Sequence, residues 1–294
     1  PPPKPRQILD ELRGQPDAHL MNAPICRLLG ALVASLCCLG AGGNPPSGQA
    51  GAPDAVRHLE HIRIIALDPG HGGKNKGCLG VDGTYEKTAT LDIAMRVQRI
   101  LTEETDAVAM MTRRDDSFLG LRERTELAND WGADVFLSIH LNADPYGVGK
   151  GVEAWFLSPD AADAEAQRLV AAEEAEYGED DDGAPAESDL VTAVIHDATH
   201  RAAQAAGEPL AESVARHLHR VTKATFRGVK QARFGVLKHA KMPAIVVECG
   251  FFSHWEEGSR LVEPAYLETV ARGIVDGLLD YDRQIGGRRT AMAP

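Results

Sequence analysis

Two histidines and two glutamates stand where apolar runs of the sequence end or begin. His71 lies in the glycine-rich segment DPGHGG, directly after an apolar run, and Glu86 precedes a longer periodic segment. His140 ends the run VFLSIH, and Glu248 ends the run AIVVE. Two histidines and one glutamate are a recurrent ligand set for catalytic zinc, and a further carboxylate can act as general base. These residue types therefore predict zinc-assisted hydrolysis, in which Glu248 could accept the proton of the attacking water.

Taken singly, each of these residues has a plainer explanation. A histidine or glutamate at the end of a strand often hydrogen-bonds a loop, and Glu86 could simply favour the N-terminus of the helix that follows it. The argument for a metal site therefore rests on the whole set.

The four residues can form one site only if their flanking segments meet at one edge of a sheet. Beyond residue 61, short apolar runs alternate with longer segments whose apolar residues recur about every 3.6 positions. This alternation predicts a single α/β domain with a mostly parallel or mixed central sheet flanked by helices, and a site at the C-terminal ends of the strands. The expected strands are Ile62–Leu67, Ala107–Met111, Val135–Ile139, Val152–Leu157 and Ala244–Val247. The expected helices are Thr88–Glu103, Leu121–Trp131 and Pro264–Tyr281.

One long stretch interrupts this alternation. From Ser158 to Val229 the chain is expected to be helical without a confident strand, broken by the acidic segment GEDDDGA at 178–184. The acidic segment itself is interpreted as a solvated loop. Because a long insertion between strands often covers or gates a site, 158–229 is a candidate regulatory insertion.

The N-terminal region is expected to contain a targeting signal and a linker. Between Met21 and Gly43 the chain has an arginine, an apolar run and small residues, which is the plan of a secretory signal peptide. A buried core helix, or a lipoprotein anchor at Cys37 or Cys38, is the alternative. The run is too short for a stable membrane span. The expected divisions are an upstream extension at 1–20, a signal peptide at 21–43, a linker at 44–61, a catalytic domain at 62–282 and a tail at 283–294.

Charge and cysteine content argue against two classes of protein, nucleic-acid binders and disulfide-stabilised domains. The formal net charge is −12 at pH 7, which argues against a nucleic-acid partner because such proteins present basic surfaces to phosphates. Beyond the apolar N-terminal run only Cys78 and Cys249 remain, too few for a disulfide framework. We interpret both as small buried residues, although a thiolate ligand or a disulfide is the alternative.

The chain resembles the zinc-dependent N-acetylmuramoyl-L-alanine amidases, a family that includes bacterial cell-separation amidases. Seven segments carry the resemblance in the same order, across most of residues 62–281. They are DPGHGG around His71, EK at Glu86, MTRRDD from Met111, LRERTELAN from Leu121, SIHLNA around His140, GVEAWFLS from Gly151 and VLKHAKMPAIVVECGFFSH from Val236.

The resemblance implies both the roles and the substrate. His71, Glu86 and His140 would bind one zinc ion, and Glu248 would be the catalytic acid and base. The scissile bond would be the amide between N-acetylmuramic acid and the L-alanine of the peptidoglycan stem peptide. Cell-wall remodelling or daughter-cell separation, outside the inner membrane in the periplasm or beyond it, would be the setting. A non-catalytic peptidoglycan-binding relative and a zinc peptidase that cuts within the stem peptide are the alternatives.

Further residues are candidates for substrate binding and regulation. Arg124, Asn129 and Asn142 could orient substrate, or could equally hydrogen-bond helices and turns. The segment LVAAEEAEYGED resembles a helix that blocks the cleft in some cell-separation amidases, where an activator protein displaces it. Glu173 or Glu174 would then be the blocking residue. A helix with solvated acidic side chains is the alternative.

Overall fold

The computed structural model describes residues 56–158, 164–177 and 190–291. The expected extension, signal peptide and acidic segment, and the expected linker up to residue 55, lie outside these residues. Within the described ranges, no helix combines the length and the apolar character needed to cross a membrane.

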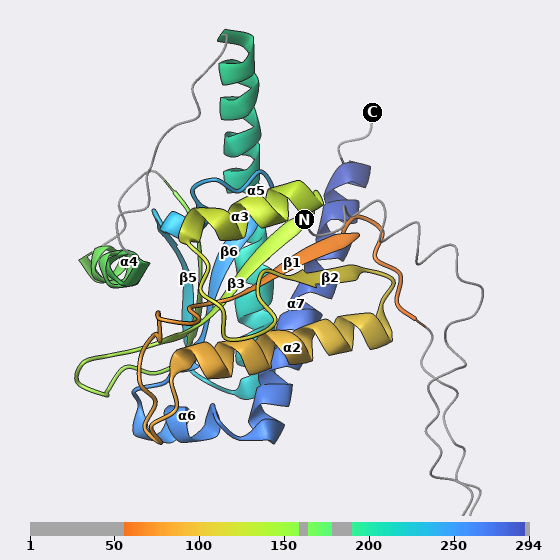
Figure 1. Ribbon diagram of the computed structural model, residues 1–294. Helices are drawn as coiled ribbons and strands as arrows, with labels where there is room; N and C mark the ends of the chain where they lie inside the picture. Colours follow the sequence, from red (N-terminus) through yellow and green to blue (C-terminus); the bar gives the residue numbers. More distant parts are fainter. Residues whose placement is uncertain (1–55, 159–163, 178–189, 292–294) are drawn as a thin grey trace, which may run out of the picture. The chain divides into compact units, whose positions relative to one another are not determined.

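Six strands form one mixed sheet in the order β2-β1-β3-β6-β4-β5 (Figure 1). All neighbouring strands are parallel except β4 and β6, which are antiparallel. The strands are β1 Ile64–Pro69, β2 Val108–Met111, β3 Val135–Asn142, β4 Val152–Leu157, β5 Phe226–Ala232 and β6 Ala244–Phe251. The predicted α/β domain with a mixed central sheet is confirmed.

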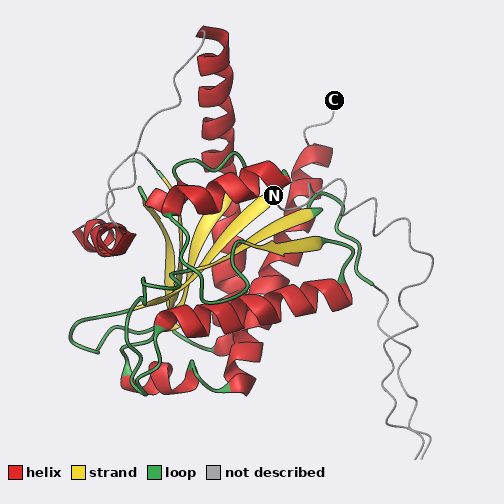
Figure 2. Ribbon diagram, in the orientation of Figure 1, coloured by secondary structure: helices red, strands yellow, loops and turns green. Residues whose placement is uncertain are grey.

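Helices cover both faces of the sheet (Figure 2). They are α2 Glu86–Glu104, α3 Leu121–Trp131, α4 Ala164–Tyr177, α5 Leu190–Thr222, the 3-10 helix η2 Gly235–Leu237, α6 Trp255–Arg260 and α7 Pro264–Ala291. Side chains of α2, α5 and α7 pack on one face in one apolar cluster, and those of α3, α4 and η2 pack on the other. Since both faces are covered, β3 and β6 are buried at every residue, which explains why their sequences are mostly apolar.

The parallel strands β1, β3 and β6 end at one edge of the sheet. Their register pairs Pro69 with Ile139 and His140 with Glu248. The loop after β1 therefore leaves the sheet beside the end of β3, and the end of β6 lies on the other side of β3. This arrangement gathers the residues that the sequence placed at strand ends.

The stretch 158–229 differs from the expectation of a helical insertion. Its last residues belong to the edge strand β5, which begins at Phe226. The C-terminal part of α5 is a core helix, where Leu210, Val214 and Leu218 are fully buried against α7 and the sheet. Among the described residues of this stretch, α4 and the N-terminal part of α5 remain as candidates for an insertion. The strand was missed because β5 is half-buried and reads FRGVKQA, with charged and apolar residues interleaved.

The packed domain also extends beyond both of the expected bounds, residues 62 and 282. Leu59, expected in the linker, is buried, and Asp282 accepts hydrogen bonds from the backbone N–H groups of Glu60, His61 and Ile62. The final helix continues to Ala291, so most of the expected tail at 283–294 is helical. The residues just before Ile62 and just after Asp282 contain too few apolar side chains for sequence periodicity to indicate that they belong to the domain.

Candidate metal centre and active site

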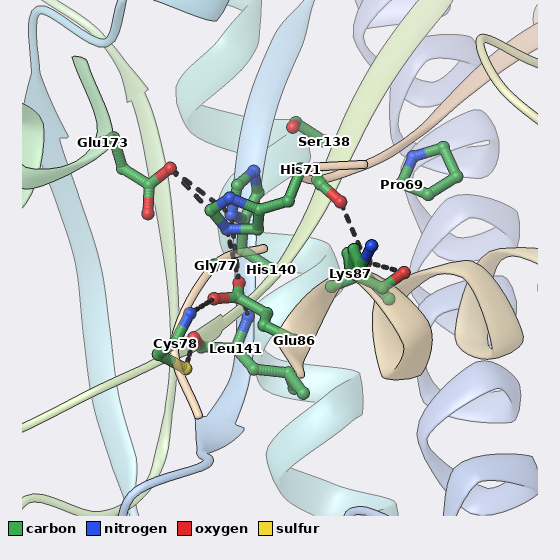
Figure 3. Close-up of polar contacts among 12 residues, drawn as sticks. Pro69, His71, Gly77, Cys78, Glu86, Lys87, Ser138, His140, Leu141 and Glu173 are labelled. Carbon is green, nitrogen blue, oxygen red and sulfur yellow. Dashed lines mark hydrogen bonds and ion pairs between the residues drawn. The ribbon is translucent and has the colours of Figure 1, made fainter. Parts of the chain in front are cut away.

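His71, Glu86 and His140 meet at the carboxyl edge of the sheet, and each is buried. Their candidate ligand atoms lie within 4.8 Å of one another. Oε1 of Glu86 is 3.0 Å from Nε2 of His71 and 3.2 Å from Nδ1 of His140 (Figure 3). Two imidazole nitrogens and one carboxylate oxygen form the donor set of many catalytic zinc sites. The structure brings the three expected ligands together, and their role as ligands stays a prediction.

The orientation of the two histidine rings fits a cation. Nδ1 of His71 is 2.8 Å from Oδ1 of Asn75, an amide oxygen that can only accept, so Nδ1 carries the proton and Nε2 keeps its lone pair. Nδ1 of His140 is buried and makes no aligned hydrogen bond among the described residues. Both nitrogens that face Glu86 are thus suited to bind a metal ion. Sequence reasoning did not identify Asn75.

Two backbone N–H groups hold the carboxylate of Glu86. Leu141 N donates to Oε1 at 2.9 Å, and Cys78 N donates to Oε2 at 3.0 Å. Burial raises the pKa of Glu86, but the neighbouring His71 and His140 outweigh burial and hold the pKa well below its usual range. The carboxylate is therefore ionised, as a metal ligand must be.

Two glycines leave room for the ligands. A Cβ at Gly70 would lie 2.4 Å from the ring of His140. A Cβ at Gly77 would lie 2.6 Å from Oε2 of Glu86, and Gly77 has a φ of +65°. Any side chain at either position would displace a ligand, so the glycines in this region serve the site itself.

His71 has a left-handed backbone, with φ of +61°, which is uncommon for a residue with a side chain. Arg124 stabilises this conformation by binding backbone carbonyls of the loop. It donates from Nη2 to the carbonyl of His71 at 2.7 Å and from Nη1 to the carbonyl of Pro69 at 2.8 Å. Its Nη1 also forms a buried ion pair with Asp68 at 2.9 Å.

Two more cations bind carbonyls of the same loop. Arg113 donates to Pro69 O at 3.0 Å and to Gly70 O at 2.7 Å. Lys87 donates to Gly73 O at 2.9 Å. Together with Arg124, these residues hold the loop that carries His71, which explains one basic residue in each of MTRRDD, LRERTELAN and the EK pair.

Glu248 lies beside the ligands at the end of β6, directly opposite His140 in the parallel register. Its side chain is buried. Burial raises the pKa of Glu248 well above its usual range, and the carboxylates of Glu86, Glu173 and Glu153 raise it further. A carboxyl group of this kind can both accept a proton and hold it for transfer.

A buried carboxylate that the sequence did not reveal lies next to Glu248. Glu153 on β4 accepts from Nδ2 of Asn142 at 2.8 Å and pairs with Arg227 at 2.7 Å and Lys230 at 2.9 Å. Both cations come from β5, the strand missed by the sequence analysis. The segment GVEAWFLS was the only signal for Glu153, and nothing local in it indicated which partners the glutamate would have.

The three candidate substrate-binding residues have structural partners. The guanidinium of Arg124 is buried and engaged with the loop that carries His71, as described above. Asn129 donates to His239 O at 2.8 Å and accepts from Lys241 N at 3.0 Å, and Asn142 bonds Glu153. These contacts favour the alternative in which all three residues hydrogen-bond the protein itself.

Helix α4 covers the site with one of its two adjacent glutamates. Oε2 of Glu173 is 3.9 Å from Nε2 of His71 and 3.7 Å from Nδ1 of His140. In Figure 3 its carboxylate points at the two rings from a different side than Glu86 does. Glu174 instead pairs with Lys238 at 3.3 Å. Of the two candidates for a blocking residue, the structure therefore brings Glu173 to the site.

Cys78 and Cys249 are free thiols, and burial raises the pKa of both. A disulfide between them is absent from the structure, and a raised pKa disfavours the thiolate that metal binding requires. Cys249 is buried, as expected, whereas Cys78 is only partly buried.

Comparison with known proteins agrees with this geometry. Residues 65–280 match the family model described as N-acetylmuramoyl-L-alanine amidase. The chain is 33% identical over 215 residues to the sporulation-specific N-acetylmuramoyl-L-alanine amidase of Bacillus subtilis, with 73% of this chain and 66% of the relative covered. It is 30% identical over 238 residues to the amidase AmiC of Escherichia coli, with 80% of this chain and 57% of the relative covered.

A solved structure of an amidase catalytic domain has a similar fold. The catalytic domain of CwlV, an N-acetylmuramoyl-L-alanine amidase from Paenibacillus polymyxa, superposes with a TM-score of 0.57 at 26% identity. That match covers 75% of this chain and 98% of the CwlV domain. The sequence match over most of the chain, the α/β fold and the buried His-Glu-His cluster agree, and the protein belongs to the N-acetylmuramoyl-L-alanine amidase family.

Proposed function

We propose that this protein hydrolyses the amide bond between N-acetylmuramic acid and L-alanine in peptidoglycan, with one zinc ion as cofactor. The observation that carries the proposal is the buried cluster of His71, Glu86 and His140 with Glu248 beside it. Because the chain covers less than two thirds of its first curated relatives, the activity of the whole protein is inferred from this cluster and from family membership.

The residues of the site divide the chemistry between them. A bound zinc ion, held by His71, Glu86 and His140, polarises carbonyl oxygens and lowers the pKa of water. Glu248 takes a proton from the water that attacks the lactyl carbonyl carbon. The bond from this carbon to the alanine nitrogen then breaks, and Glu248 returns the proton to the leaving amine. The raised pKa of Glu248, caused first by burial, suits a group that must hold the proton between these steps.

The test is release of stem peptide from purified peptidoglycan, with L-alanine as the new N-terminal residue. Chelation should abolish release, zinc should restore it, and Glu248→Gln should abolish it in protein that still binds zinc. Glu256→Gln, an exposed glutamate on α6, is the matched control and should keep full activity. New termini within the stem peptide would favour a zinc peptidase. A folded, zinc-loaded protein that binds peptidoglycan without cutting it, even after α4 is removed, would favour the non-catalytic relative.

The intact chain is proposed to be autoinhibited by α4. Glu173 lies where a substrate group would approach the cluster, and its negative charge is attracted by a cation there. An activator protein that binds α4 would expose the site. Glu173→Gln should raise basal activity in the absence of any partner, whereas Glu174→Gln should have a smaller effect because it removes only the contact with Lys238. Full activity of the intact wild-type chain would contradict this regulation.

The proposed substrate also implies where in the cell the protein acts. Peptidoglycan lies outside the inner membrane, so the activity requires export, and residues 21–43 are the expected signal peptide. Deleting them should retain the protein inside the cell in a fractionation experiment. Export without these residues would overturn the assignment of the signal.

A further inference from the structure

The backbone N–H of His71 donates a hydrogen bond to a side chain of α4. Its acceptor is the hydroxyl of Tyr177, at 3.0 Å. The tyrosine ring is buried and stacks on the ring of His71, with centroids 6.3 Å apart and an angle of 22°. The ring of Phe118 and the guanidinium of Arg124 also lie against it, at 5.9 and 5.4 Å from the centroid of the Tyr177 ring. Tyr177 therefore lies against the loop that carries one of the expected zinc ligands.

This hydrogen bond differs from those of the neighbouring amides. Gly70 N donates to Ile139 O and Gly72 N to Asn75 O, both within the body of the domain. Gly73 N donates to Asp116. The N–H of His71 alone among these four depends on α4 for its acceptor. If α4 leaves, this amide loses its partner and is open to another acceptor, because a backbone N–H is an obligatory hydrogen-bond donor.

Glu173 and Tyr177 act from the same face of α4. They are four residues apart, which places them one above the other on a helix. Glu173 approaches the two histidine rings, and the Tyr177 hydroxyl approaches the adjacent backbone amide. One helical turn thus presents an anionic oxygen and a neutral acceptor oxygen to the site. A peptidoglycan amide brings acceptor oxygens of the same kind, namely the carbonyl groups of its stem peptide and lactyl group.

We propose that the backbone N–H of His71 is a substrate-binding donor, and that the hydroxyl of Tyr177 occupies it as a mimic of a substrate carbonyl. This inference rests on the proposed amidase function. After α4 is displaced, the left-handed backbone of His71 is still held by Arg124, which binds its carbonyl. The N–H consequently keeps its direction and binds a carbonyl oxygen of the substrate next to the metal ligands.

A purely structural role for Tyr177 would depend on its ring and not on its hydroxyl. Tyr177→Phe keeps the ring contacts with His71 and Phe118 and deletes only the acceptor. Tyr281→Phe is the matched control, because Tyr281 is also buried and its hydroxyl donates to Ala206 O, far along the chain from the site. Zinc content and thermal midpoint should be measured for both variants.

The first experiment follows the amide of His71 by hydrogen exchange at single-residue resolution in the full, zinc-loaded chain. In Tyr177→Phe this amide should exchange several-fold faster than in wild type, and basal hydrolysis of peptidoglycan should rise several-fold. Tyr281→Phe should change neither. Unchanged exchange of the His71 amide in Tyr177→Phe would overturn the proposed masking.

The second experiment tests substrate binding directly, in Tyr177→Phe combined with Glu248→Gln so that the probe is not cut. The probe is N-acetylmuramoyl-L-alanyl-D-isoglutamine, whose binding is measured separately by calorimetry. Bound probe should slow exchange of the His71 amide several-fold and shift its amide proton resonance. A probe that binds without either effect would overturn the inference.

The two experiments separate this inference from the proposed function. If the uncombined Tyr177→Phe variant fails to hydrolyse peptidoglycan but the probe still protects the His71 amide, the amidase function fails and the binding role survives. If that variant hydrolyses peptidoglycan and the bound probe leaves the amide unprotected, the function stands and this inference fails.

Discussion

Glu153 and Glu248 lie directly opposite each other on the antiparallel strands β4 and β6. Opposite residues of an antiparallel pair project to the same face, so two buried carboxyl groups stand side by side at the site. Arg227 and Lys230 neutralise Glu153, whereas Oε2 of Glu248 makes no hydrogen bond among the described residues. The nearby carboxylate of Glu153 is one of the groups that raise the pKa of Glu248.

Replacing Glu153 should therefore change the pH dependence of hydrolysis. Glu248 must be ionised to accept a proton, and burial, Glu86, Glu173 and Glu153 all raise its pKa. The acid limb of the activity profile should lie above the pKa of about 4.3 of an ordinary glutamate. Glu153→Gln removes one negative charge and leaves two nearby cations, so both effects lower the pKa of Glu248. The acid limb should move to lower pH.

The measurement is kcat/KM against pH on soluble peptidoglycan fragments. Glu256→Gln, which is exposed, is the control and should leave the limb in place. An acid limb that stays fixed or moves to higher pH in Glu153→Gln would contradict the link between the two carboxyl groups.

Asn75→Ala should weaken zinc binding without removing a ligand. Asn75 orients His71 through the contact with Nδ1 at 2.8 Å. Loss of such an orienting partner typically lowers metal affinity by about 10- to 100-fold. Competition with a chromophoric chelator measures the effect. Asn129→Ala is the control, because Asn129 bonds backbone groups of His239 and Lys241 instead. Equal zinc affinity in both variants would show that Asn75 has no orienting role.

Arg124→Ala should destabilise the fold strongly. The Arg124–Asp68 pair is buried, and breaking a buried ion pair by removing one partner costs about 3–5 kcal/mol. Arg122, two residues earlier on α3, forms a partly exposed pair with Glu126. Arg122→Ala should cost about 0.3–0.5 kcal/mol, the usual value of such a helix pair. Denaturant unfolding of both proteins provides the comparison, and similar losses would refute the proposed support of the His71 loop.

Gly77→Ala should damage the metal site more than backbone strain alone can explain. Gly77 and Gly132 have nearly the same backbone angle, with φ of +65° and +64°. A Cβ at Gly77 would lie 2.6 Å from Glu86, whereas a Cβ at Gly132 would meet nothing within 4 Å. Both alanine variants should therefore lose similar stability from strain, and only Gly77→Ala should lose zinc. The measurement is the zinc content of both variants after dialysis. Zinc retained by Gly77→Ala would contradict the prediction.

Much of the fold could be predicted because local patterns report it. The strand expected at Val135–Ile139 is β3, Val135–Asn142, and the helix expected at Leu121–Trp131 has those bounds in the structure. Buried strands and amphipathic helices have apolar patterns that depend only on which faces are covered. Edge strand β5 lacks that signal because it is half-buried, and its charged residues Arg227 and Lys230 have partners on another strand.

The candidate site, like the fold, was predictable from the sequence only in part. By itself, the sequence determined the types and order of the chemical groups: two histidines and two glutamates at the ends of local elements, among glycines that allow tight turns. Only the tertiary structure decided that Glu153 faces Glu248, and that Glu173 rather than Glu174 reaches the histidines. Only it revealed that Tyr177 binds the amide of His71. Local periodicity indicates which residues share a face, but strand register and helix docking arise from contacts between distant segments, and these contacts select the partner of each buried polar group.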